Sequence, residues 1–190
     1  MLSVLLELQR LKRLDRTGWV LRGLPPGAES VAAHSYGVAL TAMLLADECA
    51  ARGAGVDAER VLRIALLHDL QETRTGDMPR TVAGYYGAEA RKAAERAAFD
   101  DVMRGTRAAD LYARLHEDYE ARASTEARLV KAADVIDLLA QALFFERAGS
   151  RGLAEFWEGA EARDFGLEGT AREVVAEAIA ALVRERGETR

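Results

Sequence analysis

Two histidines and two aspartates have the types and the setting of ligands for one metal ion: His34, His68, Asp69 and Asp134. The adjacent pair His68 and Asp69 lies near the end of residues 61–70 (VLRIALLHDL), where apolar residues leave little room for a solvated face. A carboxylate buried there needs a partner, because an unpaired charge out of water is costly. A divalent cation supplies that partner. Imidazole and carboxylate ligands together suit Mn, Co, Zn, Fe(II) or Mg rather than a thiolate-preferring metal.

The other two ligands lie on apolar stripes of predicted helices. His34 lies on the inward-facing stripe of a helix over residues 30–52, and Asp134 on that of a helix over residues 125–148. A lone histidine in such a place would be interpreted as a core residue, but the company of the other three favours a ligand. Asp137, three residues after Asp134, is expected to form a structural salt bridge or to lie behind the ligands.

The elements that must position these residues are helices. The chain is rich in Ala, Leu, Glu and Arg, has three prolines and shows no alternating strand pattern, so we predict an all-α fold. With 190 residues it should form a single domain over residues 1–190, in which residues 150–190 supply C-terminal helices. Helices are predicted near residues 2–14, 30–52, 57–72, 87–104, 107–122, 125–148, 152–160 and 170–187. Ser30, Asp57 and Thr170 are predicted N-terminal caps and Gly53 a C-terminal one.

Composition excludes several classes of protein. The net charge of −5 and a pI near 5.4 argue against nucleic acid as the main partner. No apolar run approaches the roughly 18 residues that span a bilayer, and the first residues do not resemble a signal peptide, so no membrane association is expected. The single Cys49 rules out an internal disulfide and is expected in the core. A soluble protein of the reducing cytoplasm is therefore predicted.

Several motifs in order give the chain its resemblance to a known family. They are residues 16–22 (RTGWVLR), 29–35 (ESVAAHS), 68–79 (HDLQETRTGDMP), 115–120 (LHEDYE), 124–127 (STEA) and 131–134 (KAAD). Together they resemble the HD-domain metal-dependent phosphohydrolases, and within them the 5′-deoxynucleotidase group, over most of residues 8–148. At position 116 the chain carries histidine where such proteins usually have a large aromatic residue, which should affect packing.

The resemblance implies removal of phosphate from deoxyribonucleoside 5′-monophosphates by attack of metal-activated water, with His34, His68, Asp69 and Asp134 as metal ligands. Glu72 follows His68 by four positions, so if the helix persists it lies on the ligand face and can act as general acid/base. Asp77 lies in a Gly-Asp turn that suits a side chain presented at a cleft, and the resemblance places it in the active site. It would either assist proton transfer or bind the sugar 3′-hydroxyl.

Substrate recognition is expected from the segment before His34. The guanidinium groups of Arg16 and Arg22 suit phosphate oxygens, and the indole of Trp19 could form a wall against the sugar or base. Lys131, one turn before Asp134, could reach the phosphate. The resemblance further implies a homodimer.

Two alternatives stay open. The same ligands could serve another HD-type reaction, on a nucleoside triphosphate, a cyclic dinucleotide or a guanosine alarmone. Less favoured is a non-catalytic helical interaction protein that is stabilised by a metal, because Glu72 and Asp77 would then have no use beside a structural site.

Overall fold

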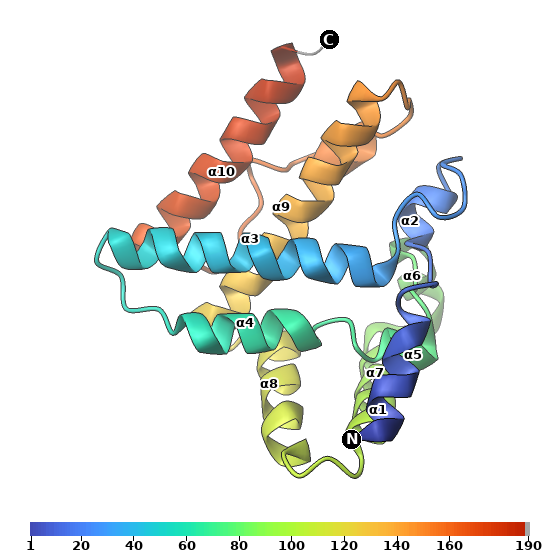
Figure 1. Ribbon diagram of the computed structural model, residues 1–190. Helices are drawn as coiled ribbons and strands as arrows, with labels where there is room; N and C mark the ends of the chain where they lie inside the picture. Colours follow the sequence, from blue (N-terminus) through green and yellow to red (C-terminus); the bar gives the residue numbers. More distant parts are fainter. Residues whose placement is uncertain (189–190) are drawn as a thin grey trace. The chain divides into compact units, whose positions relative to one another are not determined.

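The computed structural model describes residues 1–188, apart from the side chains of residues 80, 81 and 83, and it consists of helices (Figure 1). Within these residues there is no β-strand, only an isolated bridge between Asp15 and Ser30. The predicted all-α fold class is confirmed. The helices are α1 (Leu2–Glu7), α2 (Thr17–Val20), α3 (Val31–Ala51), α4 (Ala58–Leu67), α5 (Glu72–Thr75), α6 (Arg80–Tyr86), α7 (Ala88–Met103), α8 (Ala109–Ala121), α9 (Thr125–Arg147) and α10 (Gly169–Glu188), with 3-10 turns η1 (Leu8–Arg10) and η2 (Ala154–Trp157).

Side-chain caps set the starts of three long helices. The Ser30 hydroxyl accepts a hydrogen bond from the Ala33 N–H before α3, and the Asp57 carboxylate accepts one from the Arg60 N–H before α4. Ser124 does the same for α9. Each cap satisfies a backbone donor that the first helical turn leaves without an intrahelical partner. The predicted caps Ser30 and Asp57 are confirmed.

The chain leaves helical geometry just before the His-Asp pair. The helix predicted over residues 57–72 ends at Leu67, and the Leu70 N–H donates to the carbonyl of Leu67 in a tighter turn. The prediction of a helix that persists to Glu72 is therefore wrong. The reason is packing. Leu70 is 5% exposed and belongs to an apolar core cluster with Phe99, and a continuous helix would orient the Leu70 side chain differently.

Other differences lie at short elements. The helix predicted over residues 2–14 is divided into α1 and η1, and that predicted over 152–160 is reduced to η2. The short helices α2 and α6 were not predicted, because four to seven residues carry little periodicity. Thr170 lies inside α10 rather than at its cap.

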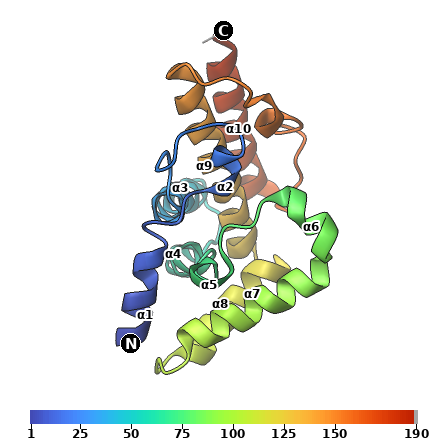
Figure 2. The ribbon, with the colours of Figure 1, turned by 90° about the vertical axis from the view of Figure 1, so that its right-hand side faces the viewer.

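The described chain forms two compact units. The first comprises residues 1–36 and 66–121, and the second residues 37–65 and 122–190. In the first unit α7 packs against α8, and an apolar cluster joins α1, η1 and α7. In the second unit α9 and α10 lie side by side (Figures 1 and 2). An ion pair between Arg186 and Glu146 links those two helices.

No α-helix within residues 1–188 combines the length and the apolar character needed to cross a bilayer.

Candidate metal centre

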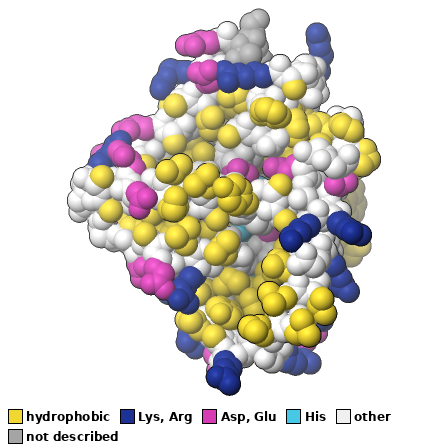
Figure 3. Space-filling model, viewed as in Figure 1, with side chains coloured by type: hydrophobic (Ala, Val, Ile, Leu, Met, Phe, Trp, Pro, Cys, Tyr) yellow, Lys and Arg dark blue, Asp and Glu magenta, His cyan; other side chains and the backbone are white. Residues whose placement is uncertain are grey.

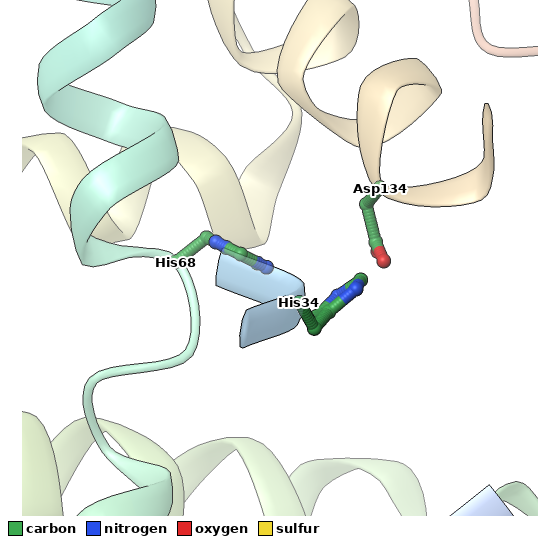
Figure 4. A group of neighbouring side chains, drawn as sticks. All are labelled: His34, His68 and Asp134. Carbon is green, nitrogen blue, oxygen red and sulfur yellow. The ribbon is translucent and has the colours of Figure 1, made fainter. Parts of the chain in front are cut away.

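Three of the predicted metal ligands lie together in the first unit. Asp69 Oδ2 is 3.2 Å from His68 Nε2 and 3.7 Å from His34 Nε2. The two imidazole rings meet edge to face, with centroids 5.6 Å apart and planes inclined by 66°. Figure 4 shows the ring of His68 pointing toward His34. Both histidines are 1% exposed, so the cluster is withdrawn from bulk water.

Different elements position these three side chains. His34 lies in the first turn of α3, where its N–H donates to the carbonyl of Ser30. His68 follows the last residue of α4, and Tyr119 of α8 packs edge-on against its ring at 5.5 Å. The carbonyl of Asp69 accepts a hydrogen bond from the N–H of Glu72, which closes the turn after α4.

The cluster fits a divalent cation. Asp69 Oδ2 is buried and accepts no hydrogen bond from the described residues, although buried carboxylate oxygens normally have partners. Two imidazole nitrogens converge on this oxygen, and a mixed nitrogen and oxygen donor set is what Mn, Co, Zn, Fe(II) and similar ions bind.

The electrostatics of the cluster favour an ionised Asp69. Burial by itself would raise the pKa of the Asp69 carboxyl. Interactions with His68, with the guanidinium of Arg16 and with His34 outweigh burial and hold the pKa of Asp69 well below its usual range. The carboxylate is therefore ready to act as an anionic ligand.

Arg16 and Asp77 border the same cluster. Arg16 Nη1 lies 3.2 Å from Asp77 Oδ1 and 3.6 Å from Asp69 Oδ2. Thr17 holds the other side of Asp77: its N–H donates to Asp77 Oδ2, and its hydroxyl donates to the Asp77 carbonyl at 2.7 Å. The structure thus brings together two predicted site residues, Arg16 and Asp77. Thr17 was not predicted as a site residue. Its place inside the motif of residues 16–22 was the signal that could have indicated it.

Trp19 and Arg22 are held by local partners. Trp19 is 1% exposed, and its indole N–H donates to Glu29 Oε2 at 2.5 Å. Arg22 Nη1 donates to the carbonyl of Gly18, one turn earlier. Glu29 is another residue that the sequence reasoning missed. Its signal was an acidic residue five positions before a predicted ligand.

Glu72 lies close to Asp69 because of a turn that was not predicted. It begins the short helix α5 and is half-buried. The hydrogen bond from its N–H to the Asp69 carbonyl makes it the third residue of a turn after Asp69, rather than the fourth residue along a helix from His68. The premise of a shared helix face is wrong, and a tight turn provides the link to the cluster.

Asp134 and Lys131 belong to the second unit. Both lie on α9, where Lys131 Nζ donates to Asp134 Oδ2 at 2.6 Å. The Asp134 side chain is 15% exposed and that of Lys131 31%. Figure 4 also draws Asp134, on α9. Asp137, one turn further, lies directly against Gly37 of α3 within the same unit.

Comparisons with known proteins identify the family of the chain. Residues 8–160 match the HD domain family. The 5′-deoxynucleotidase HDDC2 of Bos taurus is 34% identical over 143 residues, which cover 72% of this chain and 63% of that protein. The protein of the same name from Danio rerio is 33% identical over 172 residues, covering 86% and 79%. Thus the chain spans somewhat less than two thirds of the bovine relative's length.

A solved structure shares the fold over nearly the whole chain. A conserved hypothetical protein from Pyrococcus furiosus is 36% identical, superimposes with a TM-score of 0.84, and the match covers 97% of this chain and 99% of that one. The family match includes the paired His68 and Asp69 together with His34, the three residues that converge in the first unit. The chain therefore belongs to the HD domain family, and the predicted resemblance is confirmed.

Proposed function

We propose that the protein is a phosphoric monoester hydrolase, a metal-dependent 5′-nucleotidase that converts deoxyribonucleoside 5′-monophosphates into deoxynucleoside and phosphate. The convergence of His34, His68 and Asp69 beside Arg16 and Asp77 is the observation that carries this proposal. The names of the bovine and zebrafish relatives support the class of substrate.

Asp134 is the proposed fourth ligand of one divalent ion, with His34, His68 and Asp69 as the other three. Its support is its place within the residues that match the family and its acidic side chain, which already holds a cation, the ammonium group of Lys131. The ion is chosen from Mn, Co, Zn, Fe and Mg. We further propose that residues 1–190 form a single catalytic domain.

When bound, a divalent cation lowers the pKa of a water and offsets charge on the phosphate. The remaining steps use the chain's own residues. Glu72 accepts a proton from the attacking water as the new P–O bond forms, and it returns this proton to the 5′-oxygen as the bond between that oxygen and phosphorus breaks. Arg16 leaves its contacts with Asp69 and Asp77 and binds phosphate oxygens instead. Lys131 likewise leaves Asp134 and binds the phosphate.

The sugar is assigned to Asp77 and Trp19. Thr17 and Arg16 fix the Asp77 carboxylate, which either assists proton transfer or accepts a hydrogen bond from the 3′-hydroxyl. Trp19 shapes the sugar side of the site, and Arg22 stabilises the loop that carries it through the Gly18 carbonyl.

A panel assay tests the proposal. Protein stripped of metal and reloaded with Mn or Co should release phosphate from deoxynucleoside monophosphates, and should release little from triphosphates. Asp69→Asn should lower activity by about 100-fold or more, because it removes an anionic ligand. Glu72→Gln should lower kcat by roughly 100-fold while metal content stays the same.

Asp101→Asn is the matched control, since Asp101 pairs with Arg74 at the surface and should leave activity unchanged. Phosphate release from triphosphates alone, or from a cyclic dinucleotide or alarmone, would favour the alternative HD reactions. Full activity of Glu72→Gln would reject the assigned chemistry.

The proposal includes a homodimer of the reducing cytoplasm with no nucleic-acid partner. The single Cys49 is buried, and burial raises the pKa of its thiol, which suits a core residue rather than a disulfide partner. The surface proposed for the dimer contact is the exposed face of α3.

A further inference from the structure

We propose that Glu29 is a positioning residue: it holds Arg16 and Trp19 in place and thereby sets the preference for deoxyribose over ribose. The sugar preference rests on the proposed function. The positioning itself rests on contacts within the first unit.

Glu29 holds the loop at two points. Its carboxylate accepts the hydrogen bond from the indole N–H of Trp19 at 2.5 Å. Its backbone carbonyl accepts one from the N–H of Arg16 at 3.0 Å. One residue therefore fixes the backbone of the arginine that reaches Asp69 and Asp77, and the ring of the tryptophan three positions later.

A short backbone ladder strengthens this attachment. The N–H of Val31 donates to the carbonyl of Leu14 at 2.8 Å, and Asp15 and Ser30 form the isolated bridge. Residues 14–16 are thus paired with residues 29–31 immediately before α3. Since His34 lies one turn into α3, the loop that carries Arg16 is registered against the element that carries a proposed metal ligand.

Burial increases the contribution of the hydrogen bond between Trp19 and Glu29. Glu29 is 9% exposed and Trp19 1%, so neither group can exchange its partner for bulk water without a local rearrangement. Loss of the Glu29 acceptor removes a short hydrogen bond from a buried donor, and such a loss costs more than the same loss at the surface. A carboxylate oxygen of Glu29 also lies within 4.8 Å of a ring nitrogen of His34.

The hydrogen bond to Glu29 makes the indole of Trp19 a rigid wall of the sugar site rather than a mobile one. A shape-limited apolar pocket rejects an added hydroxyl by about 100-fold at most, and that discrimination depends on the wall holding its position. An indole released from Glu29 can turn aside and admit the 2′-hydroxyl. Loss of the acceptor should therefore improve the use of ribonucleotides relative to deoxyribonucleotides.

Fluorescence tests the positioning without reference to activity. The chain has two tryptophans, so in a Trp157→Phe background the emission reports Trp19. Glu29→Met, which keeps the length of the side chain but removes the acceptor, should shift this emission to longer wavelength and increase quenching by acrylamide. Glu29→Gln keeps an acceptor and should restore the emission of the parent.

Selectivity tests the functional part. In otherwise wild-type protein, Glu29→Met should lower the ratio of kcat/KM for deoxynucleotide to that for ribonucleotide by about 5- to 10-fold, with Glu29→Gln close to wild type. In a Trp19→Phe background the same change should leave the ratio unaltered, because the donor is gone. A purely structural role would lower stability in both backgrounds without moving the ratio.

The outcomes separate the two proposals. Wild-type protein that does not hydrolyse deoxynucleoside monophosphates overturns the proposed function, and the sugar preference falls with it. A deoxy-selective wild type whose Glu29→Met variant keeps both its ratio and its Trp19 emission overturns the present inference. If Glu29→Met does not fold, Glu29→Asp, one methylene shorter, replaces it with the same expected direction.

Discussion

Asp69 is the residue on which the polar contacts of the first unit converge. Both histidines and Arg16 approach the same carboxylate oxygen, within 3.2 to 3.7 Å. These close nitrogen partners, the guanidinium of Arg16 among them, offset the cost of burying the oxygen. At the scale of the residue, the structure thus brings one carboxylate and two imidazole groups together as candidate ligands.

His116 gives the molecule a separate sensitivity to acid. It is 3% exposed, stacks on Phe99 with ring centroids 4.1 Å apart, and its Nε2 has no hydrogen-bond partner among the described residues. Burial is the main reason that the pKa of His116 is lowered to about 4; Arg96 and His68 lower it further, and Asp69 opposes them. The folded protein therefore keeps this imidazole neutral where the unfolded chain protonates it.

The free energy of unfolding should consequently fall as the pH is lowered from about 6.5 to about 4. His116→Phe preserves the stacking and removes the titration, so the wild type should lose on the order of 3 kcal/mol relative to this variant across that range. Urea unfolding of both proteins at four pH values, with EDTA present to remove metal, measures the difference. A difference that stays constant with pH would contradict the assignment.

At the scale of the element, the contact between α3 and α9 depends on a glycine. A Cβ built on Gly37 would lie 2.1 Å from Asp137 Oδ1 and 2.8 Å from its Cγ. The absence of a side chain lets the Asp137 carboxylate lie against the backbone of α3. Asp137 is therefore a packing residue of this crossing within the second unit, one turn from Asp134.

Gly37→Ala should destabilise the protein by about 1 to 3 kcal/mol, because the Asp137 side chain or one helix must shift. The control is Gly55→Ala, where an added Cβ meets nothing within 4 Å. Thermal unfolding of both variants gives the comparison. Adding Asp137→Ala to Gly37→Ala should recover part of the loss. Equal effects of Gly37→Ala and Gly55→Ala would show that the close approach is unimportant.

At the scale of the whole molecule, one exposed helix face lacks the charged residues that faces in contact with solvent normally carry. Residues 31–46 of α3 contain no Asp, Glu, Lys or Arg, although Tyr36 is 71% exposed, Leu40 41% and Leu44 59%. These three residues follow one another at four-residue spacing along roughly 12 Å of helix. Hydrophobic side chains gather over α3 in Figure 3.

We expect this uncharged face to bind a second copy of the chain. A two-fold interface needs one self-complementary patch, and depletion of charge marks the centre of an interface. Leu44→Glu places two charges in each dimer contact, so light scattering after size exclusion should show a shift from dimer to monomer. Ala50→Glu, exposed on the same helix beyond the uncharged stretch, should remain dimeric. A dimeric Leu44→Glu would reject this face.

Local patterns in the sequence determined the fold class, the long helices with their Ser30 and Asp57 caps, and the choice of candidate ligand residues. Periodicity, capping and side-chain chemistry act over a few residues and can be read from neighbours along the chain. Tertiary structure alone decided the end of α4 at Leu67, the turn that joins Glu72 to Asp69, and the partners of Asp77 and Trp19. Those features depend on contacts between segments distant in sequence, such as Leu70 with Phe99, and no local pattern encodes them.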